Sequence, residues 1–379
     1  MDIKTIKEYL GVDWLAVQNR IVSSLKSDIG LLNSTNDSIL SHSGKQLRPM
    51  LSLLMAKACS GGQITESAIM YAAASELLHN ATLLHDDVAD GSDKRRGVPT
   101  IMSLMGPSVS VLVGDYWLVK AMDLILDAPD DSSSRVMRIF AKTLSDLAEG
   151  EMLQLQKAQK GDTDENDYLR IIYNKTASLF EAACVSAAIA AGASDDMVKS
   201  AKDYAVALGL AFQIKDDILD YAGTDVVGKP LGADILEQKI TMPLLGALNS
   251  AEVSEAVVIR KKVSEIVSHP EYRDEIVDFV KNNAGLEYAD PWVEYQWNGT
   301  YPTYPSKSLM VSDATGTNSD TDIICSTTQN GEVVDKVIYI NKPTNKVQIK
   351  ANNYLRDMDY NGLSDHMPIV VDFTYSYTK

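Results

Sequence analysis

Residues 69–97 read "IMYAAASELLHNATLLHDDVADGSDKRRG", an apolar stretch that leads directly into a group of aspartates and then two adjacent arginines. Its apolar residues recur every three or four positions, which is the spacing of one face of an α-helix. Alanines and leucines cover more than that one face, as is typical of a helix inside a large bundle. The stretch therefore predicts a buried helix that carries carboxylates at its end.

The same helical spacing extends through residues 1–289, for example in "MLSLLMAKAC" (50–59) and "LFEAACVSAAIAAGA" (179–193). Turn signals such as "DAPDDSSS" (127–134) separate these stretches. We expect helices as far as "GLEYA" (285–289). Residues 1–289 are therefore predicted to form one all-α helical bundle.

The chain changes character after residue 289. Residues 290–379 hold 11 of the 26 aromatic residues but only two alanines, which disfavours helix. Strand-like runs, "DKVIYIN" (335–341), "NKVQIK" (345–350) and "HMPIVVDFTYSY" (366–377), alternate with Gly, Asn and Pro clusters. We predict a second, mainly-β segment over 290–379.

The composition excludes several classes of protein. A net charge of -17 argues against sequence-independent binding of nucleic acid, which needs a basic surface. Cys59, Cys184 and Cys325 are far apart and suggest neither a zinc site nor a disulfide framework. No charged-then-apolar leader opens the chain, and no apolar run approaches the ~20 residues of a membrane span. We expect a cytoplasmic protein without stable membrane insertion.

The aspartate motif "DDVAD" (86–90) has a counterpart in "DDILD" (216–220). In each motif the first and last aspartates are four residues apart and share a helix face. One such motif alone is usually a solvated helix face, but two copies within apolar sequence would be costly to bury without cations. Opposed across a bundle, they predict a site for Mg²⁺, which prefers oxygen ligands and shares them with phosphates. The candidate metal ligands are Asp86, Asp87, Asp90, Asp216 and Asp220.

Basic residues accompany both motifs, in "GKQLRP" (44–49), "NKTASLF" (174–180) and "GKPLGADILEQK" (228–239). Each lysine or arginine alone is more often a surface residue. The planar guanidinium group of arginine and the ammonium group of lysine nevertheless bind phosphate oxygens well. Together with the aspartates they predict binding of a diphosphate. The cations concerned are Lys45, Arg48, Arg95, Arg96, Lys175, Lys229 and Lys239.

Residues 1–289 resemble trans-type polyprenyl diphosphate synthases, with six motifs in the family's order. They are "GKQLRP", "ELLHNATLLHDDVADGSDKRRG", "VLVGDY", "KTASLF", "FQIKDDILD" and "GKPLGADILEQKITMP". The resemblance implies an all-α isoprenoid-synthase bundle, a homodimer, and the Mg²⁺-dependent condensation of an allylic diphosphate with isopentenyl diphosphate.

The resemblance also implies a role for each residue at a matching position. Asp86, Asp90 and Asp216 would hold Mg²⁺, with Asp87 and Asp220 in support. The allylic diphosphate would contact Arg95, Lys175, Thr176, Gln213 and Lys229. Isopentenyl diphosphate would contact Lys45, Arg48, His79 and Arg96. The residues that would assist departure of the diphosphate, the catalytic set, are Asp86, Asp90, Asp216, Lys175 and Arg95.

Product length depends on the residues that precede the first aspartate motif. Ala81 lies five residues before Asp86, about 7.5 Å along a helix axis, and Thr82 follows it. Short-chain enzymes of this family place a bulky aromatic near this position, so we predict a long-chain product. A deeper residue that stops growth at farnesyl or geranylgeranyl length is the alternative. A terpene cyclase and a non-catalytic partner subunit are further alternatives, disfavoured by "DDILD" and by the intact aspartates respectively.

"GLSDHMPIVVDF" (362–373) resembles the closing strand of the endonuclease/exonuclease/phosphatase superfamily. That resemblance would make Asp365 and His366 active-site residues, although Ile338 stands where that family often has aspartate. The earlier parts of such an enzyme are missing from the sequence, so we expect no phosphodiesterase activity. The chain reads as a fusion of two truncated parts, and a weakly active or inactive synthase is the corresponding alternative.

Overall fold

The computed structural model describes residues 3–95, 97–222, 232–283, 287–289, 339–341, 347–356 and 369–377. The chain divides into two compact units. The first comprises Ile3–Met242 and Arg260–Arg273, and the second contains Pro243–Ile259 and the residues from Asp274 onward. All the candidate site residues that the structure describes belong to the first unit.

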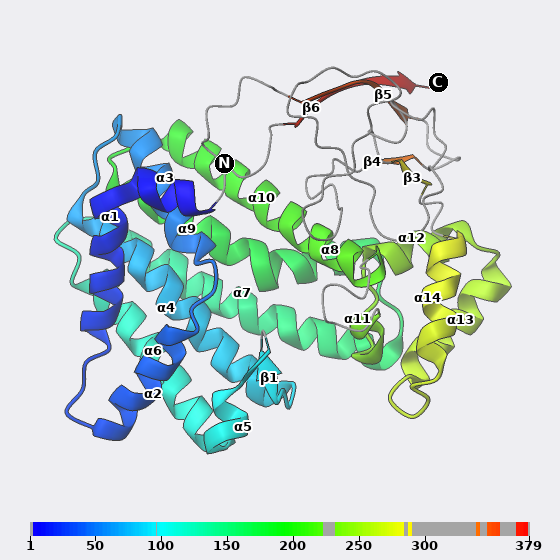
Figure 1. Cartoon of the computed structure of the whole chain (residues 1–379), viewed down its shortest axis with the longest axis horizontal. Helices are drawn as coiled ribbons and strands as arrows, with labels where there is room; N and C mark the ends of the chain where they lie inside the picture. The colour runs from blue at the N-terminus through cyan, green and yellow to red at the C-terminus, as the bar shows by residue number, and fades with distance from the viewer. Residues whose placement is uncertain are drawn as a thin grey trace, which may run out of the picture. The chain divides into compact units, whose positions relative to one another are not determined.

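The first unit is built from helices, which confirms the predicted all-α bundle (Figure 1). Its helices in chain order are α1 (Ile3–Ser24), α2 (Gly30–Ser41), α3 (Leu47–Ser60), α4 (Glu66–Ala89), α5 (Ile101–Met105), α6 (Pro107–Leu126), α7 (Ser133–Lys160), α8 (Glu165–Ile172), the π-helical turn η1 (Tyr173–Ala177), α9 (Ser178–Ala190), α10 (Asp195–Ala222) and α11 (Ala233–Leu236). Further along the chain lie α12 (Met242–Ser250), α13 (Val253–Glu265) and α14 (Tyr272–Asn283).

Helix α4 lies in the core of this bundle and packs most extensively against α6. The two helices approach closely at Gly114, where an added Cβ would lie 2.5 Å from Nε2 of His85. The hydroxyl of Ser110 donates to the backbone carbonyl of Leu84 at 2.8 Å, which links the same two helices. The end of α4, with the first aspartate motif, is therefore held in a fixed place.

A buried hydrogen bond ties α2 to α6. The indole Nε1 of Trp117, a side chain with no exposed surface, donates to Oδ1 of Asn36 at 2.8 Å. Asn36 in turn donates from Nδ2 to the backbone carbonyl of Leu25 at 3.0 Å. Both polar groups of the Asn36 amide are thereby satisfied within the core.

A short antiparallel hairpin follows α4. Strand β1 (Lys94–Arg95) pairs with β2 (Val98–Pro99), and Gly97 in the turn has a φ of 79°, which favours glycine. The hairpin turns the chain back so that Arg95 lies near the end of α4. Arg96 lies outside the described residues.

In the second unit, β3 (Glu287–Ala289) pairs antiparallel with β4 (Tyr339–Asn341). Strand β5 (Val347–Arg356) pairs with β6 (Ile369–Tyr377), with a shift of register between Ala351 and Asn353. The expected helix over 285–289 is wrong, because α14 ends at Asn283 and a strand follows. Gly285 supplies a helix-stop signal in the sequence.

The residues that suggested a nuclease-like site, Ile338, Asp365 and His366, lie outside the described residues, so that resemblance gains no support from the structure. The predicted domain boundary near 289 stays a prediction. Within the described part of the chain, none of the helices combines the length and the apolar character that crossing a membrane requires.

Candidate functional site

The first aspartate motif ends helix α4. The pKa of Asp86 is raised to about 6, mainly by burial and also by the carboxylates of Glu151 and Asp90, against the opposing charges of Lys175 and Arg95. Asp87 is 4% exposed and accepts a hydrogen bond from Nε of Arg95 at 2.8 Å. Burial also raises the pKa of Asp90. Asp86 and Asp90 thus both have raised pKa values, while Asp87 is paired with Arg95.

The second motif lies near the end of α10, and its three aspartates differ. Asp216 is exposed. Asp217 is 3% exposed and accepts hydrogen bonds from the hydroxyl of Tyr168 at 2.6 Å and from Nε2 of Gln213 at 2.8 Å. Asp220 accepts from the backbone N–H groups of Ala233 and Asp234, both at 3.1 Å. Asp217 holds helices together, and Asp220 fixes the start of α11.

Lys239 connects the two motifs electrostatically. It forms an ion pair with Glu237 and lies 3.8 Å from Oδ1 of Asp234. Burial lowers the pKa of Lys239, but the nearby carboxylates of Glu237, Asp234 and Asp90 raise it by more, so that the net shift is upward. Its charge lowers the pKa of Asp90 and also that of Asp217, although burial raises both. The charge of one cation therefore reaches a carboxylate of each aspartate motif.

Asp234 is the most perturbed carboxyl of this region. Its pKa is raised to about 7, mainly by burial and also by the carboxylates of Asp220 and Asp217, against the opposing charge of Lys239. Asp234 and Glu237 were not singled out from the sequence. Their spacing from Lys239 in "DILEQK" (234–239), three charged residues within six, is the signal that could have found them.

Lys175 and Thr176 lie in the π turn η1, next to each other. Nζ of Lys175 is 2.5 Å from Oε1 of Glu151 and donates to Oε1 of Gln154 at 3.1 Å. Oγ1 of Thr176 donates to Oε1 of Gln213 at 2.8 Å. The charge of Lys175 lowers the pKa of both Asp86 and Asp90, so the lysine lies near the first motif.

Glu151 and Gln154, the partners of Lys175 on α7, were missed because acidic and amide residues on a helix are most often solvated. Their i, i+3 spacing in "GEMLQ" (150–154) places both on one helix face. This spacing is the only local indication in the sequence that the two side chains act on the same partner.

Two of the residues expected to hold isopentenyl diphosphate, Arg48 and His79, lie on helices α3 and α4. Lys45 is exposed just before α3, and the guanidinium carbon of Arg48 lies 4.8 Å from the ring centroid of Phe180. His79 is partly buried on α4. Between Lys45 and Arg48, Gln46 adopts a left-handed conformation (φ 57°), which turns the chain sharply into α3. Lys229 lies outside the described residues.

A divalent cation fits this donor set only together with a ligand. Among the described residues, no three Asp, Glu, His or Cys side chains are grouped closely enough to hold an ion by themselves. The pair of Asp86 and Asp90 offers hard oxygen donors, and the charge of Lys175 acts on both of them. Mg²⁺ usually takes one or two carboxylates and completes its octahedron with water and phosphate oxygens, which matches this arrangement.

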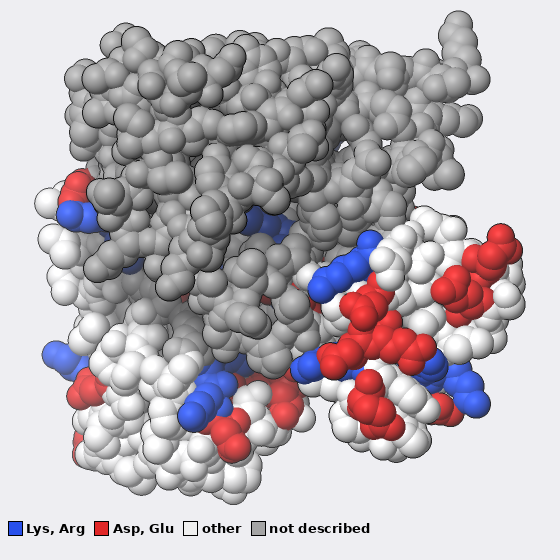
Figure 2. All heavy atoms as spheres, turned by 45° about the vertical axis from the view of Figure 1, so that its right-hand side comes forward, with Lys and Arg blue, Asp and Glu red and all other residues white. Residues whose placement is uncertain are grey.

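Charged side chains of both signs lie on one face of the molecule. Figure 2 shows acidic and basic side chains interspersed over the described part of one face. A phosphate group would therefore be selected by the local cations Lys175 and Lys239 rather than by a basic surface.

Comparison with known proteins gives concordant matches. Residues 30–280 match the family described as "Polyprenyl synthetase", a segment that contains both aspartate motifs. The chain is 38% identical over 290 residues to octaprenyl diphosphate synthase of Haemophilus influenzae, covering 76% of this chain and 86% of that protein. The structure of a decaprenyl diphosphate synthase from Rhodobacter capsulatus is similar with a TM-score of 0.67 and 38% identity, covering 74% of this chain and 86% of that one. A polyprenyl synthase from Caulobacter crescentus, complexed with calcium and isoprenyl diphosphate, has a TM-score of 0.67 and 32% identity, covering 74% and 85% respectively.

Proposed function

Because the chain belongs to the polyprenyl synthetase family and is a trans-prenyltransferase, we propose that it extends an allylic diphosphate with isopentenyl diphosphate to a long-chain trans-polyprenyl diphosphate. The observation that carries this proposal is the position of Lys239, whose charge acts on Asp90 of one motif and Asp217 of the other. A diphosphate bound between the two motifs would lie within the electrostatic reach of the same cation.

The allylic diphosphate would be bound between these motifs. Asp86, Asp90 and Asp216 would hold Mg²⁺, and Lys175, Thr176 and Gln213 would contact the phosphate oxygens. Bound Mg²⁺ supplies Lewis-acid stabilisation of the negative charge on the diphosphate. The complex of the Caulobacter relative with calcium and isoprenyl diphosphate supports the use of a divalent ion together with a diphosphate.

The side chains of the site would favour departure of the diphosphate. Lys175 is held in place by Glu151 and Gln154, so its ammonium group needs little reorganisation to meet charge that builds on the leaving oxygens. Departure leaves an allylic cation, which the double bond of isopentenyl diphosphate attacks. The departed diphosphate then takes the proton that the new carbon chain loses, so no histidine base is required.

Two observations support a long-chain product. Ala81, on the helix that leads to Asp86, has a small side chain. The relatives from Haemophilus influenzae and Rhodobacter capsulatus are named for octaprenyl and decaprenyl products. A product of farnesyl or geranylgeranyl length remains the alternative if a residue deeper than Ala81 ends the growth of the chain.

We also propose a cytoplasmic homodimer that forms through α6. Leu112, Val119 and Leu126 lie seven residues apart on this helix and are 68%, 56% and 59% exposed. A seven-residue spacing places them on one helix face, which a second copy would cover. Light scattering after gel filtration tests this; a monomer at micromolar concentration would contradict it.

The activity is tested with farnesyl diphosphate, labelled isopentenyl diphosphate and Mg²⁺, with the products sized by chromatography. Asp86→Asn and Lys175→Met should each reduce turnover by about 100-fold or more, because removal of one electrostatic stabiliser typically costs that much. Lys142→Met is the matched control, since Lys142 is an exposed lysine that pairs with Asp146 on α7. Full activity of Asp86→Asn would refute the proposal.

A further inference from the structure

The π turn η1 interrupts the helix that would otherwise join α8 to α9. The N–H of Ser178 bonds to the carbonyl of Tyr173, five residues earlier, instead of four. Such a turn inserts one extra residue into a helix, so α9 is rotated by about 100° relative to a continuous helix. Single π turns are often found at functional sites.

On one side, the turn packs against α7. A Cβ added at Gly150 would lie 2.7 Å from Cβ of Asn174 and 3.1 Å from Cγ of Lys175. Contacts below 3.0 Å are essentially never made by real Cβ atoms, so a side chain at Gly150 would displace the turn. Helix α7 also provides both partners of Lys175, Glu151 and Gln154.

On the other side, the turn packs against α10. A Cβ added at Gly209 would lie 2.5 Å from Cα and 2.7 Å from Cβ of Ala177. Helix α10 also provides Gln213, the partner of Thr176. Asn174 and Lys175 thus face α7 opposite Gly150, whereas Thr176 and Ala177 face α10, where Gly209 lies opposite Ala177.

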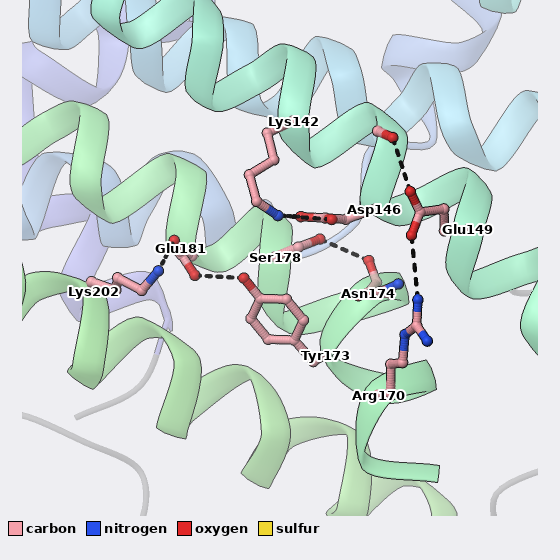
Figure 3. Close-up of polar contacts among 10 residues, drawn as sticks. Lys142, Asp146, Glu149, Arg170, Tyr173, Asn174, Ser178, Glu181 and Lys202 are labelled. Atoms are coloured by element: carbon pink, nitrogen blue, oxygen red, sulfur yellow. Dashed lines mark hydrogen bonds and ion pairs between the residues drawn. The ribbon is translucent and has the colours of Figure 1, made fainter. Parts of the chain in front are cut away.

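Polar contacts hold both ends of the turn, as Figure 3 shows. The hydroxyl of Tyr173 donates to Oε2 of Glu181 at 2.9 Å, and Lys202 pairs with the same carboxylate at 2.8 Å. Oγ of Ser178 donates to the carbonyl of Asn174 at 2.7 Å. With its ends held, the turn cannot relieve a clash in the middle without moving Lys175 and Thr176.

We propose that Gly150 and Gly209 are positioning residues for the prenyl transfer reaction. Because they lack side chains, α7 and α10 close on the π turn and set how far Lys175 and Thr176 reach toward the diphosphate. The inference rests on the proposed function, which assigns Lys175 and Thr176 to contacts with the diphosphate.

The test is a comparison of Gly150→Ala and Gly209→Ala in the full chain. Each should raise KM for the allylic diphosphate and lower kcat, with a combined loss in kcat/KM of about 10- to 100-fold, because a misplacement of about 1 Å can cost 100-fold. KM for isopentenyl diphosphate should be unchanged. Gly30→Ala is the matched control, since a Cβ at Gly30 meets nothing within 4 Å and its backbone is not left-handed.

Second-site variants separate positioning from general destabilisation. Asn174→Gly removes the Cβ that the Gly150→Ala side chain would strike, so the double variant should recover most of kcat/KM. Ala177→Gly should fail to rescue Gly209→Ala, because the backbone Cα of residue 177 still lies 2.5 Å from the new Cβ. Rescue of both pairs, or of neither, would overturn the inference.

Lys175→Met distinguishes the two proposals. If this variant raises KM for the allylic diphosphate while Gly150→Ala leaves both kinetic constants unchanged, the positioning role is refuted and the proposed function stands. If Lys175→Met itself leaves KM and kcat unchanged, the proposed role of Lys175 is refuted, and the positioning role falls with it.

Discussion

Replacing Ala81 with phenylalanine tests whether the growing product passes this point of α4. Ala81 is 1% exposed and lies five residues before Asp86, about 7.5 Å along the helix axis. If the product occupies a channel beside Ala81, the phenyl ring fills that channel, and growth should stop near this depth. The main product should then become shorter by several isoprene units, with little change in stability.

If Ala81 is instead surrounded by packed side chains, the ring has no channel to enter. Overpacking of a core costs about 1–3 kcal/mol. For a domain of this size, a loss of 1 kcal/mol lowers Tm by about 2–4 °C. The alternative outcome is thus a drop in Tm of several degrees with an unchanged product.

Ala72→Phe is the matched control. Ala72 is fully buried on the same helix, nine residues before Ala81, which places it on the opposite face at about 100° per residue. It should lower Tm without a change of product. Chromatographic sizing of labelled products, with thermal melts of all three proteins, gives the answer. A product of unchanged length from a stable Ala81→Phe protein would refute the channel.

Three further results are expected. Asn36→Ala should lower the free energy of unfolding by about 1–3 kcal/mol in urea titrations, because it leaves the buried N–H of Trp117 without its acceptor; equal stability would contradict this. Burial alone would raise the pKa of Asp130, but hydrogen bonds from neighbouring hydroxyls lower it. Its stabilising contribution is therefore present above the unfolded pKa of about 3.9 and is lost as the pH falls through the lower folded value. In urea titrations at pH 7, Asp130→Asn should have a lower free energy of unfolding than the wild type, and this difference should become smaller below about pH 4. The control Asp131→Asn, at an exposed position, should have the same free energy of unfolding as the wild type. Chelation by EDTA should abolish turnover and added Mg²⁺ should restore it; activity that persists in EDTA would exclude the metal role.

The helical bundle could be predicted from the sequence because the spacing of apolar residues along α4 and α9 reflects burial directly. A shared site for the two aspartate motifs was also predicted, from their apolar surroundings in the sequence, and it stays a prediction because Asp90 and Asp216 are exposed. The strand at Glu287–Ala289 was not foreseen, because its partner, β4, lies some fifty residues away in the sequence.

The π turn could not be predicted from local sequence. It depends on close approach at Gly150 and Gly209, which belong to other helices. The four-residue spacing in "DDILD" favours Asp216 and Asp220 as a pair but assigns no role to Asp217. Only packing shows that Asp217 faces Tyr168 and Gln213 while Asp216 is exposed.

The hydrogen bonds of Lys175 and Thr176 give these two neighbours unequal freedom toward a phosphate. An ammonium group has three hydrogens, and the partners described for Lys175 engage two of them. The third can donate a hydrogen bond to an incoming phosphate oxygen. A threonine hydroxyl has one hydrogen, and here it already points at Gln213. Thr176 must therefore break its hydrogen bond to Gln213 before it can donate one to the substrate. Lys175 can add a hydrogen bond to the substrate without losing either of these partners.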